Sequence, residues 1–144
     1  MVLFFRNLVA VALGIVIGSM ANGFIIQISG SIIPPPKGID TSTLEGLKES
    51  MPFFEFKHFV MPFLAHAIGT FVGAMIAVLL AKGQHVNRLA YAIAAVFFAG
   101  GFYMVWVLPS PLWFNASDLI LAYFPMSFLA IQMNRKLKKE KLLF

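Results

Sequence analysis

The residues of this chain whose types suit chemistry are a few polar side chains set within long apolar stretches. His66 lies near the middle of the uncharged stretch 59–81, Asn22 lies in the first apolar run, and Asp118 lies in the last. Polar groups are costly in hydrocarbon, so they usually face the interior of a helix bundle or a wet cavity. We expect all three at comparable outer depths, and predict one outward-opening pocket formed by Asn22, His66, Tyr103, Trp106, Trp113 and Asp118.

Each of these residues also has a simpler interpretation, which the sequence leaves open. Asp118 suits the start of a helix, where the helix dipole favours a negative charge. His66 suits a neutral role, bonded to a neighbouring carbonyl or hydroxyl group. Asn22 suits a bridge between two helices, and Trp106 and Trp113 suit an aromatic belt at the membrane surface.

Other kinds of site find little support in the sequence. The chain has no cysteine, which removes disulfides, thiolate catalysis and thiolate metal sites. His58, His66 and His85 are expected at different depths and lack the spacing of metal ligands, and no glycine-rich phosphate loop or serine elbow is present. We therefore expect no metal and no cofactor.

The elements that must position the polar residues are membrane helices. Of 144 residues, 60% are hydrophobic, and the mean hydropathy is +0.86, which is too apolar for a soluble domain of this size. About 20 apolar residues cross roughly 30 Å of hydrocarbon. The sequence predicts an all-α polytopic membrane protein, a four-transmembrane-helix bundle in one membrane domain. The expected helices are 3–31, 55–81, 89–108 and 114–133, with an outer loop at 34–54 and a basic tail at 134–144.

Prolines and a capping pattern predict where these helices begin, bend and end. The run 34–36 is three prolines and ends the first helix. The segment 42–45, Ser-Thr-Leu-Glu, predicts a capping box that opens a short extra helix to about Ser50 in the outer loop. Pro62 predicts a bend in the second membrane helix, and Pro125 predicts an interruption in the fourth.

Small residues predict close packing of the first two membrane helices, because small-xxx-small spacing lets two backbones approach. The expected packing residues are Gly14, Gly18, Gly69 and Gly73. Ser19 and Gly23 repeat the spacing in the first helix. Gly100 and Gly101 mark either a weak point or a close contact in the third.

The basic residues predict the orientation in the membrane. Eight of the eleven Lys and Arg residues fall on the side of the N-terminus, which favours cytoplasmic N- and C-termini. Because five of them cluster beside the last apolar span, we expect membrane lipids rather than nucleic acid as their partner. The predicted headgroup contacts are Arg135, Lys136, Lys138, Lys139 and Lys141.

The segments AHAIGTFVGAMIA and LPSPLWFNASDLILAYFPMSFLA resemble those of a group of small, uncharacterised bacterial membrane proteins. Members carry a His-x-x-Gly-[Thr/Gly]-x-x-Gly helix, then a Pro-x-Pro-x-Trp-Phe turn that leads to an Asp. The resemblance covers nearly the whole chain and implies four helices in a bacterial inner membrane, but no reaction. It draws attention to His66, Gly69, Gly73, Pro109, Pro111, Trp113 and Asp118 together.

Three classes of function fit these observations. We expect a small non-catalytic integral membrane protein, an accessory or assembly subunit that binds a protein partner or itself through its glycine-lined faces. The alternative is a binding or transport protein for a lipid or small apolar molecule, which would enter the outward-facing polar pocket. An intramembrane enzyme with His66 and Asp118 as an acid/base pair is not expected, since no nucleophile, metal or substrate site is evident.

Overall fold

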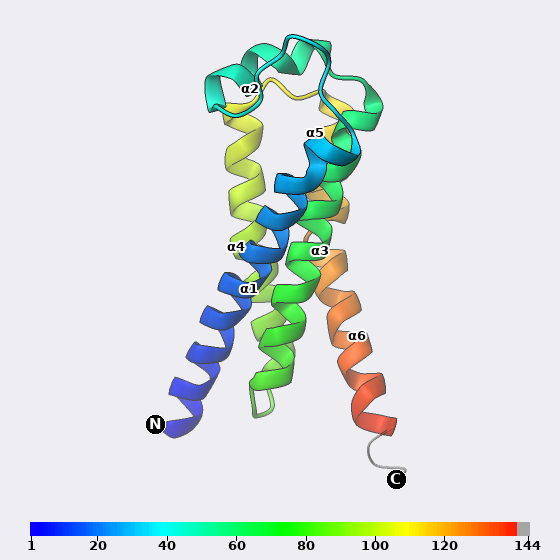
Figure 1. The fold of residues 1–144 in the computed structure, drawn as a ribbon. Coiled ribbons are helices and arrows are strands. Elements are labelled where there is room, and N and C mark those ends of the chain that lie inside the picture. Colours follow the sequence, from blue (N-terminus) through cyan, green and yellow to red (C-terminus); the bar gives the residue numbers. More distant parts are fainter. Residues whose placement is uncertain (141–144) are drawn as a thin grey trace.

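The computed structural model describes residues 1–140 and shows a bundle of helices (Figure 1). The helices of the described part are α1 (Val2–Ile32), α2 (Leu44–Ser50), α3 (Phe56–Leu80), α4 (Val86–Val107), α5 (Leu112–Leu121) and α6 (Phe124–Glu140), with a 3-10 turn at Met51–Phe53. Four segments are long and apolar enough to cross a membrane: α1, α3, α4 and the joined pair α5–α6. The prediction of an all-α, four-helix membrane bundle with a short extra helix is confirmed.

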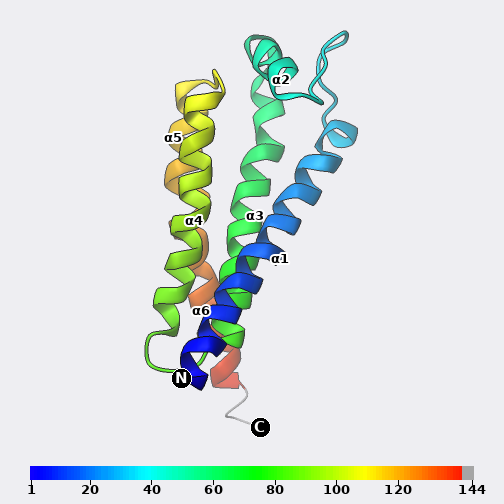
Figure 2. The same ribbon diagram turned by 90° about the vertical axis from the view of Figure 1, so that its left-hand side faces the viewer.

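Helix α3 is the centre of the bundle and contacts α1, α4, α5 and α6 (Figures 1 and 2). Its buried positions are mostly small, and include Ala65, Ala67, Gly69, Thr70, Gly73, Ala74 and Ala77. Small side chains on several faces let neighbouring helices approach from more than one direction. The stretch around His66 therefore organises the packing of the whole chain.

The two ends of the bundle differ in what they carry. Both described ends of the chain and the turn at 81–85 lie at one end, which we call the terminal end (Figures 1 and 2). The opposite end carries α2 and the connections at 33–55 and 108–111, and we call it the loop end. This arrangement requires an even number of membrane passes.

The α1–α3 interface is built on the predicted glycines. A Cβ added at Gly18 would lie 2.6 Å from the Gly69 carbonyl oxygen, and one added at Gly14 would lie 2.6 Å from that of Gly73. Gly23, by contrast, has no other atom within 4 Å of an added Cβ, so the second predicted pair does not pack. Two glycine pairs thus let the α1 and α3 backbones touch.

The helix boundaries differ from expectation mainly in the last membrane segment. The predicted helix 114–133 begins earlier, at Leu112, breaks between α5 and α6, and continues to Glu140. The break falls just before Pro125, whose missing N–H removes a helical hydrogen bond. The described part of the predicted tail is helical because its Arg, Lys and Leu residues are good helix formers.

The cap of α2 lies one residue later than the predicted capping box. Thr43 is the N-cap, and its Oγ1 accepts a hydrogen bond of 3.0 Å from the Gly46 amide. The Ser42 hydroxyl and amide instead donate to Asp40 Oδ1, at 2.6 and 2.8 Å. These two bonds lower the pKa of Asp40, and the bond from the Ser42 hydroxyl has the larger effect. They stabilise the loop at neutral pH and are lost as the pH falls through that lowered pKa.

Two further connections hold the ends of the membrane helices. At the loop end, the Glu55 amide donates to His58 Nδ1 (2.9 Å), so His58 Nε2 carries the proton and donates to the Pro34 carbonyl oxygen (3.2 Å). At the terminal end, Arg6 Nε donates to the Leu80 carbonyl oxygen (2.8 Å), which satisfies one of the orphan carbonyls that end α3. Both connections tie segments distant in sequence to the ends of α3.

Candidate functional site

The structure brings His66 and Asp118 into direct contact inside the bundle. His66 Nδ1 lies 2.9 Å from each carboxylate oxygen of Asp118, and the Tyr123 hydroxyl donates to Asp118 Oδ2 at 2.8 Å. The Asp118 side chain is 6% exposed, and that of His66 is 22% exposed. We call these three residues the His66 cluster. It joins α3 to the α5–α6 segment across 52 residues of sequence.

Helix α3 fixes the depth of His66 and satisfies the polar group beside it. His66 lies ten residues after Phe56, or roughly 15 Å from the loop end at 1.5 Å per residue. One turn further on, the fully buried Thr70 donates from Oγ1 to the His66 carbonyl oxygen at 2.8 Å. The Thr70 hydroxyl is therefore paired locally and does not compete for the imidazole.

The break between α5 and α6 brings Tyr123 to Asp118. On a continuous helix, residues five apart point about 140° away from one another, so the two side chains would not meet. The break at Ala122 and Tyr123 changes that direction and allows the hydroxyl to reach the carboxylate. The Tyr123 ring also stacks against His66, with 5.9 Å between ring centroids. The predicted interruption by Pro125 is thus what completes the site.

Helix α4 makes room for the Tyr123 hydroxyl at Gly101. A Cβ added there would overlap this hydroxyl and lie 2.6 Å from Tyr123 Cζ. The preceding Gly100 has nothing within 4 Å of an added Cβ. Of the two predicted alternatives, Gly101 is a close contact. The absent side chain lets the tyrosine ring lie between α4 and His66.

The geometry leaves one ring nitrogen of His66 available. Because Nδ1 faces a carboxylate, it carries the proton and donates, and Asp118 fixes both the tautomer and the ring orientation. Among residues 1–140, His66 Nε2 has no hydrogen-bond partner. It can accept a hydrogen bond or a proton from a bound molecule. No group of three His, Cys, Asp or Glu residues in the described part of the chain is arranged to hold a metal ion.

An apolar groove runs between α3 and α5 beside the cluster. It has a volume of about 230 Å³. The aromatic groove, as we call it, is lined by Phe56, Phe59, Phe63, Leu64, Trp113 and Leu121 among others. Phe63 and Leu121 each lie three residues from a member of the cluster, on the same side of their helices. The groove therefore passes within about one helical turn of His66 and Asp118, neither of which is among its lining residues.

The other predicted pocket residues do not join the cluster. Tyr103 and Trp106 are 65% and 80% exposed, so their side chains point away from the bundle. Asn22 packs against Gly69 at the α1–α3 interface and makes no hydrogen bond to any described residue. Trp113 lies in the aromatic groove, where its ring stacks on Phe56 at 5.1 Å. The predicted pocket is thus reduced to His66 and Asp118, with Trp113 nearby.

An apolar core separates the cluster from the terminal end. It consists of Ala10, Ala74, Ala77, Val78, Ala81, Val86, Ala90, Ile93, Ala130 and Ile131. Two buried atoms on α6, Ser127 Oγ and Asn134 Oδ1, have no partner in the described part, but Ala130 and Ile131 of this core lie between them. No continuous chain of polar side chains connects the cluster to the terminal end within residues 1–140.

Comparison of the chain with protein-family models, curated proteins and solved structures found no match. The resemblance to small bacterial membrane proteins stays a prediction.

Proposed function

We propose that this membrane protein binds a small amphipathic molecule, with the polar group at the His66 cluster and the apolar part in the aromatic groove. The observation that carries the proposal is the direct hydrogen bond between His66 and Asp118 inside a membrane bundle. Ionisable residues at membrane depth are costly and mark functional sites by default. A buried histidine–carboxylate pair adds little stability compared with packed apolar side chains, so folding alone does not account for it.

The chemistry of the cluster indicates the kind of polar group it would take. His66 Nε2 offers an acceptor when the ring is neutral and a donor when it is charged. A hydroxyl or carboxyl group on the bound molecule matches both states. The groove volume of about 230 Å³ is below the ~300–1,000 Å³ of most ligand pockets. We therefore infer a small apolar body, or a longer one that extends from the groove into the lipid.

Binding is favoured over transport by the apolar core at the terminal end. A carrier must open its site to each side of the membrane in turn. The core residues between the cluster and the terminal end are nearly all fully buried in this structure. We infer that the molecule approaches from the loop end or from the surrounding lipid.

The role of an accessory subunit has less support. That prediction depended on glycine-lined faces that would meet a partner, and Gly14, Gly18, Gly69 and Gly73 instead pack α1 against α3. A protein partner or a homo-oligomer would have to use another surface. Both stay predictions.

We also propose a bacterial inner membrane as the location, with the terminal end in the cytoplasm. The terminal end carries the basic residues of α6, of which Arg135, Lys136, Lys138 and Lys139 are exposed and suited to anionic lipid headgroups. Lys141, the fifth predicted contact, lies outside the described residues. The positive-inside rule supports this orientation.

The proposal can be tested by native mass spectrometry of the full chain, purified from its host membrane in mild detergent. We expect one defined small molecule on the wild-type protein, and about tenfold lower occupancy for His66→Gln and Asp118→Asn, since each loses a charge-assisted hydrogen bond. Leu64→Trp should lower occupancy by filling the groove without touching the cluster.

Two matched variants act as controls. Trp106→Ala removes an exposed aromatic side chain outside the site, and Ile120→Trp enlarges an exposed residue of α5 that does not line the groove. Both should keep wild-type occupancy. The proposal is overturned if the wild-type protein carries only bulk lipid, or if Asp118→Asn keeps full occupancy.

A further inference from the structure

A second hollow lies at the terminal end, between α1 and the last turn of α3. It is an open hollow with a volume of about 630 Å³, and lining residues such as Phe5 and Val9 are more than half exposed. Its lining includes Phe5, Arg6, Val9, Ala10, Leu13 and Leu80. Arg6 has the one charged side chain among the residues that line it. We call this hollow the α1–α3 cleft; it contains no residue of the His66 cluster or the aromatic groove.

Arg6 is held in place but keeps most of its donors. Its Nε donates to the Leu80 carbonyl oxygen at 2.8 Å, which fixes the plane of the guanidinium group. Four N–H groups on the two terminal nitrogens are then left for another acceptor. Within residues 1–140, no Asp or Glu side chain forms a salt bridge with Arg6, so no described carboxylate neutralises its charge.

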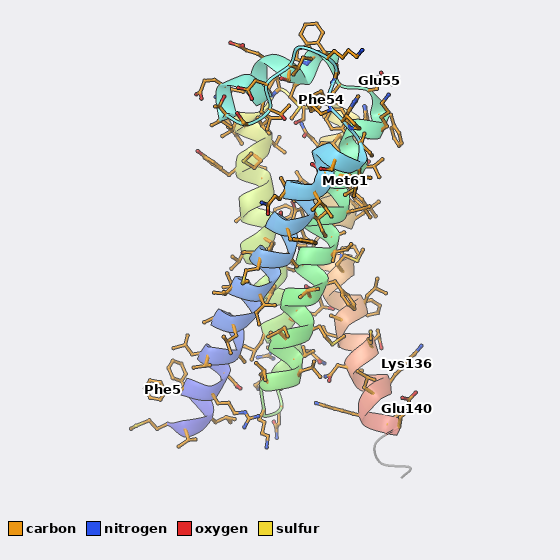
Figure 3. All side chains as sticks on the ribbon, viewed as in Figure 1. Phe5, Phe54, Glu55, Met61, Lys136 and Glu140 are labelled. Carbon is orange, nitrogen blue, oxygen red and sulfur yellow. The ribbon has the colours of Figure 1, made fainter. Side chains whose placement is uncertain are left out.

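The cleft lies where a lipid headgroup would be. Arg6 is in the second turn of α1 and bonds the end of α3, so its charge is at the level of the membrane surface. Val9 and Leu13 follow at one-turn spacing and lead from there toward the middle of the bundle. Figure 3 shows Phe5 on α1 and Lys136 on α6 at opposite sides of the terminal end, so this cleft is separate from the basic stretch of α6.

We propose that the α1–α3 cleft binds one anionic phospholipid. Its phosphate group lies on the terminal nitrogens of Arg6, and one acyl chain follows Phe5, Val9 and Leu13. A guanidinium group matches a phosphate through paired, charge-assisted hydrogen bonds, and the apolar lining matches a hydrocarbon chain. A second copy of the chain or another helix would fill the apolar part but would leave the Arg6 charge unmatched. The site is independent of the function proposed above.

The test uses the full chain in nanodiscs that contain equal amounts of phosphatidylglycerol and phosphatidylcholine, and counts retained lipids by native mass spectrometry. The wild-type protein should retain one phosphatidylglycerol in preference to phosphatidylcholine. Arg6→Gln should lower that preference about tenfold, because it removes a charge-assisted pair. Val9→Trp should lower retention equally by filling the cleft, and it leaves the bond between Arg6 and Leu80 in place.

Matched controls separate this site from general attraction to basic residues. Val16 is as exposed as Val9, at 55%, and lies on α1 outside the cleft, so Val16→Trp should retain the lipid. Arg135→Gln removes a basic residue of α6 and should also retain it. The proposal is overturned if Val9→Trp binds phosphatidylglycerol like the wild type. It is equally overturned if Arg135→Gln loses as much as Arg6→Gln, or if dimers occupy the cleft in place of lipid.

Discussion

Asp118 carries two hydrogen bonds at once, and this makes it the most sensitive position of the His66 cluster. It accepts from His66 Nδ1 and from the Tyr123 hydroxyl. An amide presents one oxygen and one NH₂ group, so it cannot accept from two donors through two different atoms. The geometry of this residue therefore leads to a measurable stability difference.

We expect Asp118→Asn to lower the free energy of unfolding by about 1–3 kcal/mol, the usual cost of leaving a buried donor unpaired. The triple variant His66→Leu, Asp118→Leu and Tyr123→Phe should recover part of that loss, because it leaves neither a ring N–H nor the Tyr123 hydroxyl unpaired. Thermal unfolding in detergent measures both. A melting curve for Asp118→Asn that matches the wild type would contradict the bond.

Gly101 and Gly100 offer a comparison of neighbouring residues in one helix. Gly101→Ala should destabilise the protein by about 1–3 kcal/mol, because the new Cβ overlaps the Tyr123 hydroxyl. Gly100→Ala meets open space and should be neutral, or stabilising by up to about 1 kcal/mol through helix propensity. Adding Tyr123→Phe to Gly101→Ala should restore part of the loss. Equal melting temperatures for the two alanine variants would mean that Tyr123 does not rest on Gly101.

At the level of the helices, the α1–α3 pair depends on backbone contact at its glycines. Gly18→Ala places a methyl group 2.6 Å from the Gly69 carbonyl oxygen and should cost about 1–3 kcal/mol, since the two backbones must separate. Gly23→Ala, five residues later on the same helix, meets nothing and should be as stable as the wild type, or up to about 1 kcal/mol more stable through helix propensity. Detergent melting curves compare the two. If Gly18→Ala and Gly23→Ala have the same melting temperature, the α1–α3 interface tolerates a wider separation of the two backbones than the structure shows.

The helices and the depth of each polar residue are predictable from the sequence because the apolar spans are long and their ends are marked by prolines and charges. The depth of His66 and Asp118 could be placed in this way. The direction in which each side chain points could not, because membrane helices are apolar on all faces and carry no amphipathic stripe. Tyr103 and Trp106 share the expected depth of the pocket, yet they point outward.

Tyr123 was missed for a different physical reason. The sequence predicts an interruption of the fourth helix at Pro125, but not which side chain the break redirects, and on a continuous helix Tyr123 would point away from Asp118. Pro125, two residues later, was the available signal, since the chain before a proline tends to leave the helix. The Gly100–Gly101 pair indicated a weak point or a close contact but not the contacting residue, because the role of Gly101 depends on the tyrosine that fills the space beside it.

For the molecule as a whole, the arrangement of its ends links fold to orientation. The described N-terminal end, the turn at 81–85 and the end of α6 lie at the terminal end, and the loop around Gly38 lies at the other (Figure 1). Reporters placed at these points must therefore fall into two groups on opposite sides of the membrane. Which group is cytoplasmic depends on the distribution of Lys and Arg, and seven of the ten within residues 1–140 lie on the terminal side.

We expect reporters inserted at Gln84 and fused after Phe144 to be active in the cytoplasm, and one inserted at Gly38 to be active on the opposite side. Gly38 and Gln84 are exposed and lie outside the helices, so insertion there should leave the bundle intact. If the reporters at Gln84 and Phe144 are both on the non-cytoplasmic side, the bundle stands but its proposed orientation in the membrane is reversed. Reporters at Gln84 and Phe144 on different sides of the membrane would contradict the bundle itself. The structure has two membrane crossings between these points, α4 and the joined pair α5–α6, which requires both reporters on the same side.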